Sequence, residues 1–304
     1  METPRQTLSY LHQLLRERGI KPKNKLGQNF LIDLNLIDLL LRSAELTPDD
    51  LAIEIGTGTG SLTAQLADRA GAVLSVEIDP AFHAMADEAI GPRDNVMLLY
   101  ADVLKGKNEL HPRVLAALGE LRAKSRCPFL KMVANLPYAV ATPVITNFLM
   151  SELPFERFVV TVQWEIAERL VAEPGHKAYG ALAVLVQSLA DVEIVRRLAP
   201  SVFWPRPKVD SAFVRIWPRA AKRAEVIKRV GSIQNFRDFL RDLYTHRRKN
   251  LRGALVGWPS GRREKADVDA KLAALNFDSA VRAETLDREQ HLRLCEAFQQ
   301  PTSS

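Results

Sequence analysis

Residues 51–60 read Leu51-Ala-Ile-Glu-Ile-Gly-Thr-Gly-Thr-Gly60, an apolar strand that ends in three glycines spaced two residues apart, and this stretch decides the fold. A helical pattern follows over residues 61–69. A strand that turns through glycines into a helix predicts a site for a nucleotide-like ligand at the carboxyl end of a parallel strand. Glycine has no Cβ, so it permits the tight turn and lets the ligand approach the backbone.

An acidic residue on the next expected strand, residues 72–76, indicates the kind of ligand. Glu77 ends this strand 21 residues after Gly56, where a carboxylate can accept hydrogen bonds from both ribose hydroxyls. A nicotinamide dinucleotide is one candidate, and a tight turn without a ligand is another. The dinucleotide pattern is Gly-x-Gly-x-x-Gly, whereas here Gly60 comes one residue early and Glu54 precedes the glycines. This spacing is more similar to the S-adenosylmethionine loop of Rossmann-like methyltransferases, whose cofactor has no phosphate.

Length and composition bound the class of protein. The 304 residues suffice for one large or two smaller domains, and 47% hydrophobic residues suffice for a core. Cys127 and Cys295 lie far apart, which predicts a reducing compartment, no disulfide framework and no metal site. The sequence has neither the apolar core of a signal peptide at its start nor a run of about 18 apolar residues. We therefore expect a cytoplasmic protein without a membrane span.

Positive charge is concentrated at the two ends of the chain. Residues 219–304 hold 18 Lys and Arg against 11 Asp and Glu, a net charge of +7, so the first 218 residues carry −1 of the total of +6. Within them, residues 1–30 hold six basic and two acidic residues. Such clusters suit a polyanion such as RNA, because each phosphate contact releases counterions. A solvated surface is the simpler explanation of any single cluster.

The order of expected elements predicts an α/β fold with a Rossmann-like sheet of mostly parallel strands, because strands alternate with helices. Two closely spaced strands at 191–198 and 210–217 predict an antiparallel pair at the sheet edge. Residues 105–126 are expected to form a polar helical connection that is broken or kinked at Pro112. The pattern is helical after Pro218. We expect a ligand-binding domain at 1–218 and a small, basic, all-α domain at 219–304.

Two further segments are candidates for the ligand site. Asp102 lies just past the expected strand 96–100, at the same sheet edge as the glycines, and its carboxylate could accept a hydrogen bond from an adenine amino group. A turn or helix-cap aspartate is the alternative. Residues 26–33, with the polar pair Gln28-Asn29 between apolar neighbours, suit a wall or lid of the ligand site or simply the start of a helix.

Asn135-Leu-Pro-Tyr138 follows the expected strand 129–134 and fits the chemistry of methylating a base amine. The Asn135 side-chain oxygen and the Leu136 carbonyl can accept hydrogen bonds from the amine, which favours a tetrahedral nitrogen with its lone pair free. Pro137 stiffens the backbone, and Tyr138 offers a ring for the base to stack on. The alternative is a proline turn after a buried strand.

These motifs, in this order, resemble the small-subunit ribosomal RNA adenine N6,N6-dimethyltransferase family over nearly the whole chain. The family dimethylates two adjacent adenosines of bacterial 16S rRNA, so the resemblance implies S-adenosylmethionine as cofactor and the small ribosomal subunit as partner of a monomeric enzyme. The segments that carry it are Gln28–Leu31, Glu54–Gly60, Val76–Asp79, Asp102, Asn135–Tyr138, Thr142–Pro143, Val162–Leu170, Phe203–Ser211 and Arg247–Leu251.

The resemblance implies roles for individual residues. Asn29 and Leu31 would line the methionine side of the cofactor, Gly56 and Gly58 would approach it, Glu77 would hold the ribose and Asp102 the adenine. Asn135 would serve cofactor and target amine together with Leu136 and Pro137, while Tyr138 and Phe203 would close on the two faces of the target adenine. The residues implied to contact rRNA are Lys208, Arg247, Arg248 and Lys249.

The sequence is compatible with two alternative functions. One is a large-subunit rRNA adenine methyltransferase of the macrolide-resistance type, and the other is a non-catalytic ribosome-assembly factor on the same fold. The segment 203–211 and the basic cluster at 247–249 favour the small-subunit family, and the intact glycine loop argues against a non-catalytic factor. The chain departs from the family pattern at Ala139-Val140-Ala141, where polar residues often follow the tyrosine.

Overall fold

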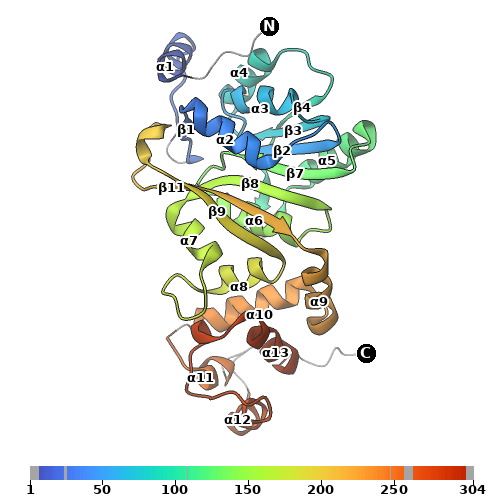
Figure 1. Ribbon diagram of the computed structural model, residues 1–304, viewed down its shortest axis with the longest axis vertical. Coiled ribbons are helices and arrows are strands. Elements are labelled where there is room, and N and C mark those ends of the chain that lie inside the picture. The colour runs from blue at the N-terminus through green and yellow to red at the C-terminus, as the bar shows by residue number, and fades with distance from the viewer. Residues whose placement is uncertain (1–6, 24–25, 108, 247, 257–262, 299–304) are drawn as a thin grey trace. The chain divides into compact units, whose positions relative to one another are not determined.

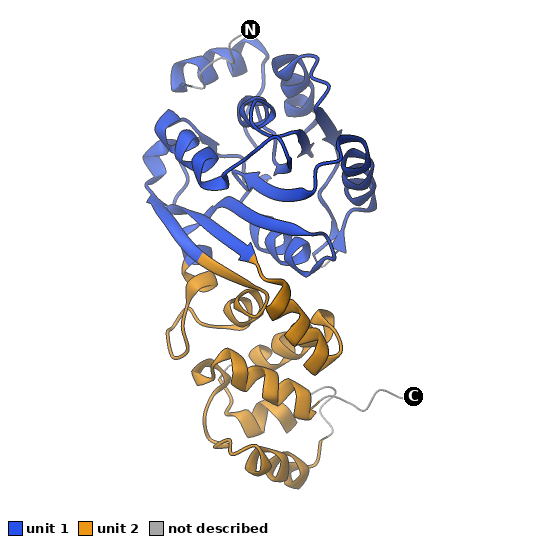
Figure 2. Cartoon of the chain, turned by 45° about the vertical axis from the view of Figure 1, so that its right-hand side comes forward, with its two compact units in different colours: residues 1–167, 193–217 blue, residues 168–192, 218–304 orange. Residues whose placement is uncertain are grey.

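The computed structural model describes residues 7–23, 26–107, 109–246, 248–256 and 263–298. The chain divides into two compact units (Figure 2). Unit 1 comprises Met1–Ala167 and Glu193–Trp217, and unit 2 comprises Glu168–Val192 and Pro218–Ser304. The structure thus groups residues 168–192 with the C-terminal helices, whereas the sequence places a single boundary at residue 218. The physical reason lies in α8 (Ala181–Gln187), whose apolar side chains pack against α10 (Ile233–Thr245) and α13 (Arg288–Phe298).

A seven-stranded sheet forms the centre of unit 1, with the strand order β4-β3-β2-β7-β8-β11-β9 (Figure 1). The neighbours from β4 to β8 are parallel, and β11 runs antiparallel to β8. This arrangement confirms the predicted Rossmann-like sheet, with the two late strands side by side at its edge. The strands are β2 (Asp50–Ile55), β3 (Ala72–Glu77), β4 (Val96–Tyr100), β7 (Phe129–Ala134), β8 (Phe155–Gln163), β9 (Ala190–Leu198) and β11 (Ser211–Pro218).

Helices cover both faces of the sheet (Figure 1). On one face, alternate residues of four strands, Ala52, Val73, Val133 and Val159, form a core with buried leucines of α2 and α3. On the other face, α5 packs against β3 and β4. Covering both faces buries β2 and β3 along their whole length, and most of their side chains are apolar. The helices are α2 (Leu34–Ala44), α3 (Ser61–Ala67), α4 (Pro80–Ile90), α5 (Pro112–Ser125), α6 (Ala141–Met150) and α7 (Trp164–Val171).

The N-terminal segment is tied to unit 1 by a short ribbon that the sequence does not predict. Strand β1 (Phe30–Leu31) pairs antiparallel with β10 (Phe203–Trp204), next to the 3₁₀ helix Pro200–Val202. Helix α1 (Leu8–Glu17) buries Leu11 and Leu15 against Phe30 and against Phe82 of α4. Within residues 26–33, Phe30 and Leu31 thus form strand β1, and Asp33 caps the following helix α2.

The connection from residue 105 to 126 differs from the prediction. A small hairpin comes first, formed by β5 (Leu104–Gly106) and β6 (Glu109–Leu110). Pro112 then begins α5 instead of breaking a helix, because a proline in the first turn loses no hydrogen bond. The side chain of His111 caps this helix by accepting a hydrogen bond from the Arg113 amide, with the two nitrogens 3.1 Å apart.

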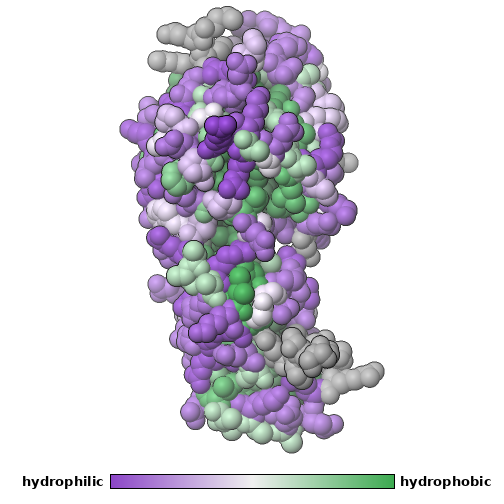
Figure 3. Space-filling view, turned by 90° about the vertical axis from the view of Figure 1, so that its right-hand side faces the viewer, coloured by the Kyte–Doolittle hydropathy of each residue, from purple (hydrophilic) through white to green (hydrophobic). Residues whose placement is uncertain are grey.

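Unit 2 is mainly helical. Its C-terminal part begins with α9 (Ala220–Val230), where the sequence predicts only a charged boundary; Val226 and Val230 of this helix are fully buried. On the face shown in Figure 3, both units expose mainly hydrophilic residues, with hydrophobic areas interspersed. None of the helices in the described part of the chain is long and apolar enough to cross a membrane. The remaining elements are α11 (Leu251–Val256), α12 (Lys265–Ala274) and the 3₁₀ helix Ala283–Thr285.

Candidate active site

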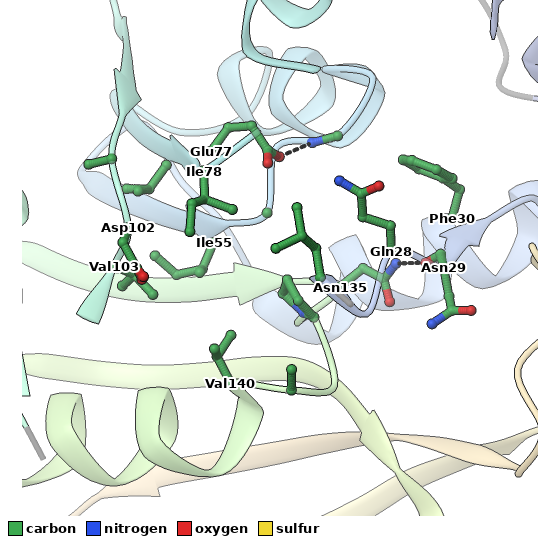
Figure 4. Close-up of a pocket in the computed structure, with 17 residues that line it drawn as sticks. Gln28, Asn29, Phe30, Ile55, Glu77, Ile78, Asp102, Val103, Asn135 and Val140 are labelled. Carbon is green, nitrogen blue, oxygen red and sulfur yellow. Dashed lines mark hydrogen bonds between the residues drawn. The ribbon is translucent and has the colours of Figure 1, made fainter. Parts of the chain in front are cut away.

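A cavity of about 210 Å³ opens at the carboxyl edge of the unit 1 sheet (Figure 4). The predicted site residues reach it from four strands: Gly56 follows β2, Glu77 ends β3, Asp102 follows β4 and Asn135 follows β7. The described residues that line it include no Lys or Arg. They are Leu26, Gln28, Asn29, Phe30, Ile55, Gly56, Gly58, Val76, Glu77, Ile78, Ala101, Asp102, Val103, Asn135, Pro137, Ala139 and Val140.

The glycine loop has no room for side chains. Gly56 has φ +87°, and a Cβ there would lie 3.0 Å from Cγ of Pro137. Gly58 has φ +56°, and a Cβ there would lie 2.8 Å from the Phe30 ring. Both conformations are in the region that favours glycine. The loop is thus held between β1 on one side and the segment after β7 on the other.

Glu77 is buried and shapes the glycine loop as well as the cavity. One carboxylate oxygen accepts a hydrogen bond from the amide of Gly58 and the other from the amide of Asp79, both at 2.9 Å. Figure 4 shows the first of these bonds at the cavity wall. Burial raises the pKa of Glu77, although the two amides oppose this effect. Each carboxylate oxygen has a second lone pair, so the group can still accept hydrogen bonds from a ligand.

Below the loop, Glu54 is almost fully buried in a polar network that the sequence does not predict. Its Oε2 accepts hydrogen bonds from the hydroxyls of Thr63 and Ser75, with Ser75 Oγ at 2.7 Å, and Ser75 in turn lies 2.6 Å from the hydroxyl of Thr57. Burial raises the pKa of the Glu54 carboxyl to about 8, which the two hydroxyls only partly oppose. Burial therefore favours the uncharged form of this acid, which braces the start of the loop.

Asp102 is exposed, and it fits both of its sequence interpretations. Its Oδ1 accepts a hydrogen bond from the amide of Leu104 at 2.9 Å, as a turn aspartate does. The residue also lines the cavity, between the apolar side chains of Ile78 and Val103 (Figure 4). These flanking side chains would suit the two faces of a flat ring.

Asn135 lies on the cavity wall with its amide group oriented. Its Nδ2 donates a hydrogen bond to the backbone carbonyl of Asn29 at 2.7 Å (Figure 4). This contact turns the amide nitrogen towards β1 and leaves the side-chain oxygen to accept hydrogen bonds. Pro137 packs on the glycine loop and lines the cavity, while the side chain of Leu136 is buried, so only its backbone could face a ligand.

Tyr138 is partly buried, and its hydroxyl forms a short hydrogen bond with the hydroxyl of Ser211. Burial raises the pKa of Tyr138, and the bond with Ser211 opposes this effect. The residue does not line the cavity itself but belongs to the segment that forms its edge. Ser211, the first residue of β11, is a site neighbour that the sequence does not reveal, because it is 73 residues away.

Two predicted residues lie in the core rather than at the cavity. Phe203 is 2% exposed, belongs to a core cluster with residues of α2 and β11, and does not line the cavity. Its role in closing on one face of the target adenine stays a prediction. Leu31 pairs with Phe203 in the β1–β10 ribbon and is 4% exposed. Leu31 lines only a second, smaller hollow beneath the glycine loop, together with Glu54 and Asn135. Both residues face inward because the ribbon packs one side on the core.

Gln28 and Asp79 close the N-terminal side of the cavity. Gln28 donates to Asp79 Oδ2 at 3.2 Å and accepts from the amide of Lys23 at 2.7 Å. The Lys23 ammonium forms an ion pair with the same Asp79 oxygen at 2.9 Å. Burial acts to raise the pKa of Asp79, but the hydrogen bonds from Lys23, Ala81 and Gln28 outweigh it and hold the pKa below its usual value. The segment before β1 is thereby fixed next to Glu77.

The predicted RNA contacts belong to both units. Lys208 is exposed in the loop before β11 of unit 1, and Arg248 and Lys249 are exposed before α11 in unit 2. Arg247 lies outside the described residues. In the part of the chain that the structure describes, no group of three or more His, Cys, Asp or Glu residues could hold a metal ion.

Comparison with known proteins shows the family. Residues 19–300 match the family described as ribosomal RNA adenine dimethylase. A protein of Moorella thermoacetica named ribosomal RNA small subunit methyltransferase A is 36% identical over 299 residues, 98% of each chain. The protein of the same name from Pediococcus pentosaceus is 41% identical over 278 residues, 90% of this chain and 88% of the relative. The similarity therefore extends through both units.

Solved structures show the same fold. A dimethyladenosine transferase from Plasmodium falciparum superposes with a TM-score of 0.68 at 23% identity, covering 87% of this chain and 95% of that chain. The 23S rRNA methyltransferase ErmE superposes with a TM-score of 0.60 at 26% identity, covering 89% of this chain and 100% of that chain. Both superpositions extend beyond the unit 1 sheet, because they cover more residues than unit 1 contains.

Proposed function

We propose that this chain, which belongs to the ribosomal RNA adenine dimethylase family, performs its methyl transfer at the cavity of unit 1. It is an rRNA adenine N6,N6-dimethyltransferase of the small-subunit type, and relatives of that name match it over nearly its whole length. The observation that supports this site is the convergence of Gly56, Glu77 and Asn135 on one cavity.

The residues of the cavity fit S-adenosylmethionine better than a dinucleotide. The described lining includes two carboxylates, Glu77 and Asp102, and no basic side chain that could neutralise a pyrophosphate. Most other lining residues are apolar or glycine, as in most small-molecule sites. When bound, S-adenosylmethionine supplies an electrophilic methyl group on a positively charged sulfur, and this charge is compatible with the nearby carboxylates.

The cofactor roles follow the positions of the residues on the wall. Glu77 would accept hydrogen bonds from the ribose hydroxyls, and Gly56 and Gly58 would let the cofactor lie against the backbone. Asp102 would accept a hydrogen bond from the adenine amino group. Asn29 would hold the methionine end, beside the Asn135 amide that it orients. Leu31 supports this wall from the core rather than by direct contact.

Asn135 would present the target amine to the methyl group. Its side-chain oxygen and the Leu136 carbonyl would each accept a hydrogen bond from the amine, which draws the nitrogen towards tetrahedral geometry and frees its lone pair. Alignment of the reacting atoms then supplies much of the rate, as in other reactions that depend on orientation. The nitrogen loses its proton easily once methylation has made it cationic, so a strong general base is not needed.

The target adenine would stack on Tyr138, and the rest of the RNA would contact basic residues. We assign the rRNA backbone contacts to Lys208, Arg248 and Lys249, which are exposed, and retain Arg247 as a sequence-based candidate. The partner is the small ribosomal subunit with its 16S rRNA. We further propose that the enzyme acts as a monomer in the cytoplasm and uses no metal.

The test is Asn135→Ala. We expect methylation of immature small subunits to fall by at least about a hundredfold, because two functions of one side chain are lost. Incorporation of labelled methyl groups into rRNA measures the rate, and nucleoside mass analysis identifies the product.

Two controls make the result specific. Circular dichroism should show an unchanged fold, and purified large subunits should not be methylated by the wild-type protein. Wild-type activity of Asn135→Ala would refute the assigned site, whereas preferential methylation of large subunits would favour the macrolide-resistance alternative.

A further inference from the structure

Ser211 is buried completely, and its hydroxyl meets the hydroxyl of Tyr138. A buried hydroxyl is costly unless it has a partner, so the pair is a specific contact rather than a chance approach. The two residues lie 73 positions apart, in different elements of unit 1. The contact therefore joins the segment after β7 to the first residue of β11.

The sheet order explains why this contact can hold the ring. β8 lies between β7 and β11, with Ala134 opposite Val160 and Ser211 opposite Gln163. Tyr138, which follows β7, thus reaches past the end of the neighbouring strand β8 to Ser211 of β11. Because β11 is paired with β8 from Ser211 onwards, the hydrogen-bond partner of the tyrosine hydroxyl is part of the sheet.

The backbone of the same segment is fixed separately. The backbone of Gly27 lies so close that a Cβ there would be 3.0 Å from the Tyr138 nitrogen, and Pro137 packs on Gly56. The main chain is thus held at one end of the tyrosine, while the aromatic ring could still rotate about its side-chain bonds. The hydrogen bond with Ser211 holds the other end. Because the hydroxyl oxygen lies on the axis about which the ring rotates, the two restraints together fix the position and direction of this axis.

We propose that Ser211 is a positioning residue for methyl transfer, because its hydroxyl holds the Tyr138 ring at the place where the target adenine stacks. This inference rests on the proposed stacking role of Tyr138. The hydroxyl of Tyr138 takes no part in the chemistry; it is an anchor, and phenylalanine could stack equally well without being held.

The second methyl transfer depends most on this anchor. The N6-monomethyl amine has a single remaining proton, so one hydrogen bond fewer holds it, and its methyl group adds bulk next to the incoming one. The stacked ring then supplies a larger share of the alignment. A loosened ring should slow the second transfer more than the first and increase the release of rRNA that carries N6-monomethyladenosine.

The experiment compares Ser211→Ala, Tyr138→Phe and the double variant in the full-length protein, with small subunits and S-adenosylmethionine. We expect each single variant to lower the single-turnover rate by about tenfold, as for loss of one hydrogen bond. The double variant should be no slower than either single variant, because both remove the same contact. The ratio of N6-monomethyladenosine to N6,N6-dimethyladenosine should rise when the variants are compared at equal total methylation, and at equal methylation a lower fraction of folded enzyme does not change this ratio.

Thr161→Val is the matched control. Thr161 is a fully buried residue of β8 opposite Phe213 of β11, and its hydroxyl has no hydrogen-bond partner among the residues that the structure describes. The Thr161→Val variant should leave the product ratio unchanged. In all variants, the cofactor affinity measured by equilibrium dialysis should stay within about twofold of the wild-type value.

Tyr138→Ala separates the two possible failures. If Tyr138→Ala is strongly impaired but Ser211→Ala keeps the wild-type rate and product ratio, the anchoring inference is wrong and the stacking role stands. If the rate losses of Ser211→Ala and Tyr138→Phe simply added in the double variant, the two hydroxyls would act independently, and the anchoring inference would again be wrong. If Tyr138→Ala methylates at the wild-type rate, the stacking role itself is refuted.

Discussion

Gly58 packs so closely against Phe30 on the cavity wall that even one added methyl group should matter. We expect Gly58→Ala to weaken S-adenosylmethionine binding by at least about tenfold, because a Cβ would lie 2.8 Å from the Phe30 ring and alanine at φ +56° costs about 1–2 kcal/mol. Strand β1, which carries Phe30, and the glycine loop would have to move apart. Equilibrium dialysis with labelled cofactor measures the affinity.

Gly91→Ala is the control for this substitution. Gly91 also has a positive φ, +65°, but a Cβ there would meet no atom within 4 Å. Its ψ of −170° places it in a region that is essentially restricted to glycine, so this variant should lose about 1–3 kcal/mol of stability in urea unfolding and keep its cofactor affinity. Equal loss of affinity in both variants would show that backbone strain, and not the contact with Phe30, weakens binding.

Individual site residues were predictable where the chemistry and the local pattern agreed. Gly56, Glu77 and Asn135 follow strands of a recognisable α/β pattern, so their meeting at one edge follows from the fold class. Phe203 carried no such constraint, because an aromatic residue before prolines can face the core or the site. The partner of Tyr138 could not be predicted either, since a contact over 73 residues leaves no local pattern.

At the scale of elements, the sequence predicts best the helices with strong end signals. The starts of α2 and α4 are marked in the sequence, because Asp33 and Asp79 cap their first turns and Pro80 begins α4. The β1–β10 ribbon escaped prediction because its strands have two residues each and pair over a long distance in the chain. Helix α9 was hidden by its charged residues, although its buried valines lie four apart.

The packing of α13 on α10 gives unit 2 a sensitivity to acid. His291 of α13 is fully buried, with Nε2 3.2 Å from the hydroxyl of Tyr244 on α10 and Nδ1 2.8 Å from the Asp287 carbonyl. Burial lowers the pKa of His291 to about 4, from 6.5. The folded state therefore holds the neutral ring, whereas the unfolded chain takes up a proton as the pH falls below 6.5. The stabilisation is complete above pH 6.5 and is lost as the pH falls towards 4.

We predict that His291→Gln flattens the acid limb of the stability profile. The pKa of His291 differs by about 2.5 between the unfolded and folded states, so the free energy of unfolding of the wild type should fall by on the order of 3 kcal/mol between pH 7 and pH 4. Glutamine does not titrate, so the variant lacks this contribution. Urea midpoints measured across this range give the slope. His176→Gln is the control, because His176 is exposed and should leave the slope unchanged. An unchanged slope in His291→Gln would assign the acid sensitivity to other groups.

At the scale of the whole molecule, the excess of positive charge matters less than the part of it that remains unpaired. Much of the basic charge after residue 218 is used inside unit 2: Arg229 pairs with Glu289 and Glu296, and Arg241 pairs with Asp238 and Asp242. Arg248 and Lys249 are exposed and form no ion pair with any residue that the structure describes. Unpaired cations release more counterions from RNA than cations that are already neutralised.

The double variant Arg248→Ala with Lys249→Ala should therefore weaken RNA binding and also its dependence on salt. Each lost phosphate contact removes roughly 0.7–0.9 from the slope of log affinity against log salt concentration, so the slope should fall by up to about 1.8. Filter binding of small-subunit rRNA at several salt concentrations measures both quantities. The control is Arg241→Ala with Arg252→Ala, which removes the same formal charge from residues paired with aspartates, Arg252 with Asp269. Because those charges are already neutralised, the control should keep the wild-type slope; an equal change in both variants would mean that net charge alone, and not these two residues, attracts the RNA.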